Sequence, residues 1–162
     1  MTIAVGDTLP EATFFEMTDE GPKGIPSNDV LGQGTVALFG VPGAFTPTCH
    51  MKHMPSFVAQ ADALRAKGVD AIVCVTVNDP FVVGEWAKST GAPAAGIRVV
   101  GDPTAAFVDA LGISFDGAVV GLGTRAQRFS MLVKDGKVAA VNVEEAPSDM
   151  DVTSAEALLA AL

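Results

Sequence analysis

Short apolar runs alternate with segments of helical periodicity through the middle of this 162-residue chain. Residues 35–41 (TVALFGV) and 71–77 (AIVCVTV) are uninterrupted apolar runs with the length of a buried strand. Between them, from Pro47 onward, apolar residues recur at helical spacing until Lys67 and Gly68, which are typical of a helix end. The pattern therefore predicts a strand, a helix and a second strand.

The same alternation continues to the end of the chain. A second helix is predicted by Asp79 as its N-cap, Pro80 at its first position and Gly91 at its end. The remaining predicted elements are a strand at 96–102, a short helix at 104–112, a hairpin of 128–133 and 137–143, and a last helix after the capping box Thr153-x-x-Glu156. The order βαβα followed by ββα is typical of a thioredoxin-like α/β domain, with a central mixed sheet flanked by helices.

No internal repeat, low-complexity tract or linker divides the chain, and residues 1–162 fit one domain with a substantial core. Hydrophobic residues make up 49% and charged residues 18% of the sequence, a composition that favours a folded domain over disorder. The two densest polar runs, 17–29 and 144–151, are expected to be surface loops.

The charge balance narrows the range of partners. The net charge of −9 repels phosphate backbones and anionic lipid surfaces, so we expect no nucleic-acid partner and no membrane partner. Residues 30–51 contain no Asp, Glu, Lys or Arg, but their glycines and prolines predict a strand, a turn and a helix start instead of a membrane span. No basic segment precedes an apolar run near the N-terminus, so a cytoplasmic location is expected.

The candidate chemistry centres on Cys49, one of only two cysteines. The chain has no C-x-x-C motif, and two cysteines do not make a disulfide framework. Cys49 falls in the first turn of a predicted helix, where unpaired backbone N–H groups and the helix dipole favour a thiolate. Composition alone leaves a buried, inert cysteine as an equal alternative. Cys74 stands in the middle of an apolar strand and is expected to be a core residue.

The residues before Cys49 shape a turn. Pro42 fixes the chain as it leaves the strand, Gly43 lets the backbone come close, and Thr46 carries a hydroxyl three positions before the thiol, although an N-cap is its simpler role. Lowering the pKa of a thiol from about 8.5 to about 6 raises its ionised fraction roughly thirtyfold, but costs roughly tenfold in nucleophilicity. A fast reaction with an oxidant therefore also needs a buried cation aimed at the atoms that acquire charge.

Four arginines are candidates for that cation: Arg65, Arg98, Arg125 and Arg128. Arg65 lies near the far end of the Cys49 helix, where its charge interacts favourably with the helix dipole. The sequence pattern does not indicate whether Arg98 lies near the thiol. Arg125 and Arg128 flank a predicted strand at a spacing that puts them on opposite faces. If one of them faces the thiol, the other is expected to be solvated.

With these residues assembled, "PGAFTPTC" resembles the P-x-x-x-T-x-x-C signature of peroxiredoxins, while "CVTVNDPFVVGEW" and "RFSMLVKDG" resemble their type-five, or type II, branch. The resemblance extends over nearly the whole chain. It implies a thiol peroxidase in which Cys49 attacks hydrogen peroxide or a small alkyl hydroperoxide and becomes a sulfenic acid. It also implies that Thr46 bonds the thiolate and the peroxide, that Pro42 shields the site and that Arg128 holds both reacting groups. Arg125 keeps its interpretation as a surface residue.

The sequence says less about how the sulfenic acid is reduced back to the thiol. Some relatives have a resolving cysteine before the last helix, but "EEAPSDMDVTS" contains none. We therefore prefer a single-cysteine cycle, with glutathione and a glutaredoxin as the implied reductant and thioredoxin as the second choice. The resemblance implies no metal and no organic cofactor. It does imply a homodimer formed around the active site, with Phe45 in its interface. The alternatives are a peroxide sensor without turnover or a redox-regulated chaperone, whereas a disulfide oxidoreductase is disfavoured by the missing C-x-x-C.

Two histidines follow Cys49 closely. His53 is four residues after the thiol and shares its helix face, a spacing that also suits a metal site or a cysteine-hydrolase dyad. Both ideas are weak, because His50 points elsewhere and the chain offers neither a second ligand pair nor an orienting third group. His53 is therefore expected at the edge of the site, and Trp86 in the core or at an interface.

Overall fold

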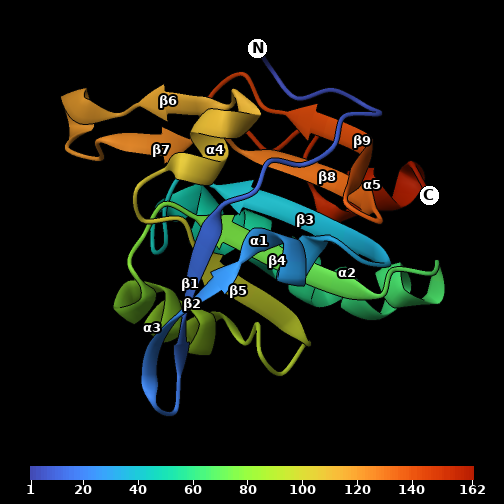
Figure 1. The fold of residues 1–162 in the computed structure, drawn as a ribbon, viewed down its shortest axis with the longest axis horizontal. Coiled ribbons are helices and arrows are strands. Elements are labelled where there is room, and N and C mark those ends of the chain that lie inside the picture. The colour runs from blue at the N-terminus through green and yellow to red at the C-terminus, as the bar shows by residue number, and fades with distance from the viewer.

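A seven-stranded mixed sheet forms the centre of the computed structural model, which describes residues 1–162. The strand order is β2-β1-β5-β4-β3-β8-β9, with β3, β4 and β5 parallel and β8 antiparallel to β3. The strands are β1 (Thr13–Thr18), β2 (Gly21–Pro26), β3 (Thr35–Val41), β4 (Ala71–Thr76), β5 (Ile97–Gly101), β8 (Phe129–Lys134) and β9 (Lys137–Val143). Two further short strands, β6 (Ser114–Asp116) and β7 (Thr124–Ala126), form a separate hairpin at one end of the molecule (Figure 1).

Helices cover both faces of this sheet, as the sequence predicts. The short helices α1 (Ser27–Leu31) and α4 (Ala106–Leu111) pack on one face, where Phe14, Phe107 and Phe129 belong to the core. The other face is covered by α2 (Met54–Ala66), α3 (Pro80–Thr90) and α5 (Ala155–Ala160). Figure 1 shows α1 in front of the sheet and α2 behind it. None of the helices combines the length and apolarity needed to cross a membrane.

Residues 17–29 are not the surface loop that their polarity predicts. They belong to the hairpin of β1 and β2 and to helix α1. This hairpin lies at the edge of the sheet, and Phe14 and Ile25 are its only buried residues. Its strands mix apolar residues with polar residues, glycine and proline, so they lack the continuous apolar run of a central strand. Residues 144–151, by contrast, contain neither helix nor strand, as predicted.

The helix that starts after Thr46 is interrupted at Cys49. Residues Cys49–His53 form a π-helical turn, η1, before α2 continues the same direction. Pro55 has no N–H to donate to the carbonyl of Met51, and its ring crowds that carbonyl, so regular α-helical bonding is broken in this turn. The uninterrupted helix that we predict from periodicity is therefore wrong at its first turn.

The cap of the last helix is displaced by one residue from the predicted capping box. Ser154 is the N-cap of α5, and its hydroxyl accepts a hydrogen bond from the Ala157 N–H across 3.1 Å. Thr153 is buried and its hydroxyl donates to Glu144 Oε1 across 2.9 Å. A tertiary partner has thus taken the hydroxyl that the local pattern assigns to capping.

Candidate active site

Cys49 lies where the chain leaves the centre of the sheet. Strand β3 ends at Val41, the turn 42–46 follows, and Cys49 begins η1. The thiol is fully buried and belongs to the apolar core that also contains Phe39 and Phe57. Burial in hydrocarbon alone would make the thiol inert, so its reactivity depends on the polar atoms beside it.

The polar neighbour of Cys49 is the guanidinium of Arg128, which is 1% exposed. Its Nη2 atom donates to Cys49 Sγ across 3.1 Å and to the Pro147 carbonyl across 2.9 Å. Its Nη1 atom donates to His53 Nδ1 across 3.0 Å. Arg128 immediately precedes β8, which pairs with β3, so the sheet brings this cation to the strand that leads to Cys49.

His53 lies inside the site and not at its edge as expected. Its Nδ1 must carry the lone pair, because a guanidinium can only donate, and its Nε2–H therefore donates to the Thr153 carbonyl across 2.9 Å. Burial, with a further contribution from the Arg128 charge, lowers the pKa of His53 to about 3. The imidazole is neutral at physiological pH.

The turn before Cys49 is stabilised by one hydrogen bond within the turn and by another from a distant residue. The Thr46 hydroxyl donates to the Gly43 carbonyl across 2.7 Å, and no hydrogen bond joins it to Cys49 in this structure. Pro42 is buried, and its carbonyl accepts a hydrogen bond from Arg125 Nη1 across 3.2 Å. Pro42 and Thr46 thus precede the thiol in sequence and shape the turn that presents it.

Arg125 is not the solvated surface cation that strand alternation predicts. It belongs to β7, is half-buried, and donates through Nε to the Leu122 carbonyl across 2.8 Å as well as to Pro42. The prediction fails because the β6–β7 hairpin folds against the active-site turn, a contact that periodicity along one strand does not contain. Both arginines therefore reach the Cys49 turn, but only Arg128 reaches the sulfur.

The loop 144–153 is held close to this site by a buried carboxylate. Glu144 Oε1 accepts hydrogen bonds from the Val152 N–H, the Thr153 N–H and the Thr153 hydroxyl, across 2.7, 3.0 and 2.9 Å. The carbonyls of Pro147 and Thr153 in turn accept from Arg128 and His53. Sequence reasoning missed this role because Glu144 begins an acidic, polar run that is typical of solvent-exposed loops.

Cys74 occupies the core position predicted for it. It lies in β4, pairs in register with Phe39 of β3 and has no exposed surface. Burial raises the pKa of Cys74 well above its ordinary value, and the neighbouring Cys49 adds to that effect. Cys74 is therefore a protonated core thiol in this structure.

A second polar contact lies on the outer side of η1. Trp86 is fully buried in the core, and its Nε1–H donates to His50 Nδ1 across 3.1 Å. The His50 ring stacks on Phe45, with 5.7 Å between the ring centroids. Phe45 has a φ of 64° and is 50% exposed, so an apolar ring is held at the surface beside the Cys49 turn.

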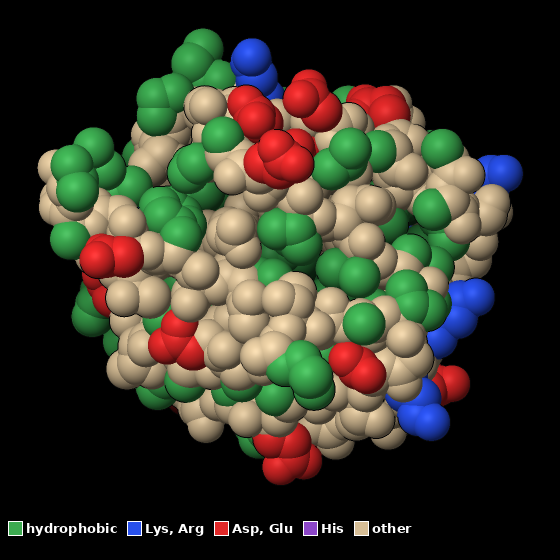
Figure 2. All heavy atoms as spheres, turned by 90° about the horizontal axis from the view of Figure 1, so that it is seen from above, with side chains coloured by type: hydrophobic (Ala, Val, Ile, Leu, Met, Phe, Trp, Pro, Cys, Tyr) green, Lys and Arg blue, Asp and Glu red, His purple; other side chains and the backbone are tan.

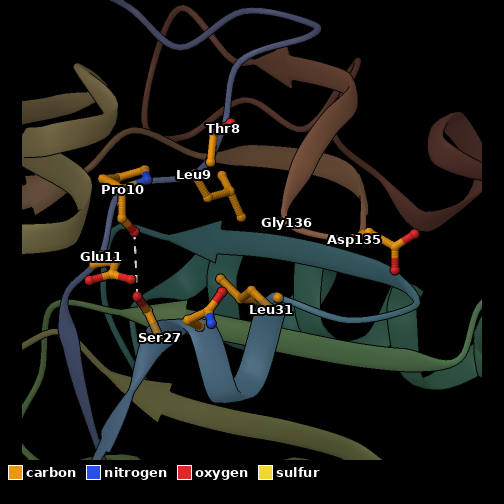
Figure 3. Close-up of a pocket in the computed structure, with 10 residues that line it drawn as sticks. Thr8, Leu9, Pro10, Glu11, Ser27, Leu31, Asp135 and Gly136 are labelled. Carbon is orange, nitrogen blue, oxygen red and sulfur yellow. Dashed lines mark hydrogen bonds between the residues drawn. The ribbon is translucent and has the colours of Figure 1, made fainter.

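Other parts of the surface carry no comparable chemistry. A cavity of about 150 Å³ lies beside the start of β3, and Ser27 Oγ in its lining donates to the Pro10 carbonyl across 3.4 Å. Figure 3 shows the side chains that line it. The cavity lies at the end of β3 opposite Cys49, and its lining has no cysteine, histidine or basic side chain. No three His, Cys, Asp or Glu side chains cluster as metal ligands. Acidic side chains are scattered over the face shown in Figure 2, with basic ones mostly along one edge.

Comparisons with known proteins agree with this geometry. A family model described as Redoxin matches residues 4–159. Peroxiredoxin-2B of Arabidopsis thaliana is 43% identical over 162 residues, which cover 99% of this chain and 98% of that protein. Peroxiredoxin-2E-2, chloroplastic, of Oryza sativa subsp. japonica is 43% identical over 165 residues, covering 99% and 73%. The crystal structure of reduced Prx3 in complex with H₂O₂ from Vibrio vulnificus has a TM-score of 0.92 and 44% identity, and the match covers 99% of each chain.

Proposed function

The chain belongs to the redoxin family and is a peroxiredoxin of the type II, or type-five, branch, and from that membership we propose that Cys49 is its peroxidatic cysteine. The thioredoxin-like fold predicted from the sequence and the activity of a thiol-dependent peroxidase follow from the same relatives. The observation that carries the assignment of Cys49 is the 3.1 Å contact between its Sγ and Arg128 Nη2.

The first half-reaction is a displacement at oxygen. The Cys49 thiolate attacks the terminal oxygen of hydrogen peroxide or an alkyl hydroperoxide, an S–O bond forms and the O–O bond breaks. The sulfur is oxidised to a sulfenic acid, and the departing hydroxide or alkoxide takes a proton from solvent. Arg128 stabilises the thiolate before attack and the negative oxygen that develops during it. No carboxylate lies within 4.0 Å of its guanidinium, so its charge is available for both.

The Nε–H group of Arg128 is also available for this chemistry. Its Nε atom is buried and has no hydrogen-bond partner, a condition that is rare in folded proteins and is often associated with function. We assign to Thr46 a hydrogen bond to the thiolate and to the peroxide, made when its hydroxyl turns from Gly43. Pro42, buried in the same turn, shields the reacting atoms from water.

The second half-reaction uses a thiol from outside the chain. Cys74 is a buried, protonated thiol on a central strand, which argues against its attack on the sulfenic acid. A first reductant thiol forms a mixed disulfide with Cys49 and releases water, and a second thiol restores Cys49 and leaves as a disulfide. We propose glutathione with a glutaredoxin as this reductant and thioredoxin as the second choice.

The oligomeric state and the location of the enzyme are part of the same proposal. We infer a homodimer in the cytoplasm, with residues 1–162 folded as one domain whose sheet collects strands from β1 to β9. Phe45 and Met51, exposed by 50% and 74%, lie beside Cys49 in sequence and give its surroundings an apolar surface suited to a second copy. Sedimentation of the protein as a monomer at micromolar concentration would contradict the dimer.

Steady turnover tests this function. With excess hydrogen peroxide, glutathione and glutaredoxin, the wild-type protein should consume many equivalents of peroxide per chain, and Cys49→Ser should consume none. Consumption that stops near one equivalent under every thiol reductant would contradict the catalytic cycle and support the peroxide-sensor alternative.

A further inference from the structure

We propose that His53 is a positioning residue, which holds the Arg128 guanidinium against Cys49 through a neutral acceptor and leaves the arginine's positive charge for the thiolate. The proposal rests on Cys49 being the reacting cysteine. It adds His53 to Cys49, Thr46, Arg128 and Pro42 as a fifth residue of the peroxidase site, one that does not touch the peroxide. Its basis is a chain of two hydrogen bonds, from Arg128 to His53 and from His53 to the backbone of the loop 144–153.

The guanidinium has a fixed orientation because each of its two terminal nitrogens has a partner. Nη2 donates to Cys49 Sγ and to the Pro147 carbonyl, and Nη1 donates to His53 Nδ1. A planar guanidinium held at both nitrogens cannot rotate away from the sulfur without breaking bonds in a buried site. Without the acceptor on His53, Nη1 would be a buried donor with no partner, free to turn towards another oxygen.

The imidazole is itself fixed by its surroundings. Its Nε2–H donates to the Thr153 carbonyl, and Thr153 is held by two hydrogen bonds to Glu144. The ring packs against two aromatic rings, Phe39 and Phe57, at centroid distances of 5.1 and 5.6 Å. These contacts set both the tautomer and the plane of the ring, so that the Nδ1 lone pair points at Arg128.

The neutrality of this acceptor matters for the reaction. A carboxylate in the same place would bind Nη1 more strongly, but its negative charge would offset the arginine's charge beside the thiolate. On its other sides the ring contacts the aromatic rings of Phe39 and Phe57 and the Thr153 carbonyl, none of which ionises. The buried Glu144 carboxylate bonds Thr153 and not the imidazole. The positive charge of Arg128 is therefore left for Cys49.

Cys49 and His53 are the first and last residues of the same π-helical turn. Both side chains are fully buried, so this turn directs both towards Arg128. Thiol and acceptor thus lie on one rigid element, and one guanidinium bridges them. The π-turn spaces the two side chains so that both reach the same planar group.

Three substitutions with the same branching at Cγ separate the parts of this role. His53→Asn keeps a neutral acceptor close to the position of Nδ1, His53→Leu removes the acceptor, and His53→Asp replaces it with a charge. His50→Leu is the matched control, because His50 lies on the same turn and bonds Trp86 instead of Arg128. The readouts are the second-order rate constant for peroxide, measured in single turnover, and the pH dependence of Cys49 alkylation.

We expect His53→Asn to stay within about threefold of the wild-type rate constant, while His53→Leu loses roughly 10- to 100-fold. That is the loss seen in metal sites when the partner that orients a metal-binding side chain is removed. His53→Asp should move the midpoint of Cys49 alkylation to higher pH than any other variant. If His53 served only in packing, the midpoint of Cys49 alkylation would not move. The rate constants of the variants would then fall in the same order as their thermal stabilities. Asn would also have no advantage over Leu.

The proposal is overturned if His53→Leu reacts with peroxide at the wild-type rate, or if His53→Asp alkylates with the wild-type pH profile. Loss of activity in His50→Leu equal to that in His53→Leu would also overturn it, because the effect would then belong to the turn and not to the contact with Arg128. Failure of the proposed function itself is recognised separately, by a wild-type protein and a Cys49→Ser variant that behave alike towards peroxide.

Discussion

The guanidinium of Arg128 donates a hydrogen bond to the sulfur of Cys49 across 3.1 Å, although 79 positions separate the two residues in the chain. The contact exists because β8 pairs with β3 and delivers Arg128 to the side of the sheet from which Cys49 is presented. It converts a fully buried thiol in an apolar core into one that has a cation beside it. The chemistry of the site follows from this pair.

The two arginines near the Cys49 turn should differ sharply when removed. Arg128→Ala removes a buried charge from the reacting sulfur and should slow peroxide reduction roughly 100-fold or more. Arg125→Ala removes a bond to the Pro42 carbonyl, worth about 1 kcal/mol or roughly fivefold in rate. Stopped-flow measurement of the two rate constants checks this, and equal losses would show that the wrong cation has been assigned.

Cys74 should be dispensable for turnover. Because it is a buried, protonated core thiol, Cys74→Ala should keep peroxide turnover with glutathione within about threefold, at a stability cost of roughly 1 kcal/mol for the small cavity. Intact mass after oxidation decides the point. A wild-type product lighter by two hydrogens, absent from Cys74→Ala, would make Cys74 a resolving cysteine.

His53 should make the protein's stability sensitive to acid. Its pKa is about 3 in the folded protein, below the ordinary value of 6.5, so the unfolded chain takes up a proton that the folded protein does not accept. The contribution is fully present above about pH 6.5 and is lost as pH falls towards 3, with a slope of up to about 1.4 kcal/mol per pH unit. Denaturant titrations from about pH 4 to 7 should show a flatter slope for His53→Asn. Identical slopes would rule out the buried neutral imidazole.

Glu144 should control the order of the loop beside the site. Glu144→Ala removes an acceptor of three hydrogen bonds and should destabilise the protein by about 2 to 4 kcal/mol. Hydrogen exchange at the Val152 and Thr153 amides should become faster, and peroxide reduction should fall because Pro147 and Thr153 no longer hold Arg128 and His53. Glu144→Gln, which keeps an acceptor oxygen, should recover part of both losses. Unchanged exchange in Glu144→Ala would contradict the role of the carboxylate.

Much of the fold could be predicted because its central strands are continuous apolar runs. Strand β3 (Thr35–Val41) and strand β9 (Lys137–Val143) match the predicted ranges, and α3 has the predicted cap and end. The β1–β2 hairpin was missed because an edge hairpin buries few side chains, and the β6–β7 hairpin because each of its strands is only three residues long. The π-turn at Cys49 could not be seen, since it interrupts a helical periodicity that continues on both sides.

The sequence alone predicts the candidate reacting cysteine, but it predicts fewer of the residues that surround this cysteine. The spacing of Pro42, Thr46 and Cys49 is local and can be read from the chain. The partners of Arg128 are not local, because they depend on strand pairing and on the loop 144–153. The four-residue spacing from Cys49 to His53 was the one signal for the buried acceptor. Without the position of Arg128, that spacing predicts only a shared face.

Mass mapping after a single equivalent of hydrogen peroxide tests the central assignment most directly. The chain contains 6 methionines that can also take up oxygen, and Met51 shares a peptide with Cys49, so the added oxygen must be located to the residue by fragmentation of the digested product. We predict that the wild-type protein gains one oxygen on Cys49, that this oxygen is removed by glutathione, and that Cys49→Ser gains none at position 49. Oxygen found only on methionines, with Cys49 unmodified, would contradict the account.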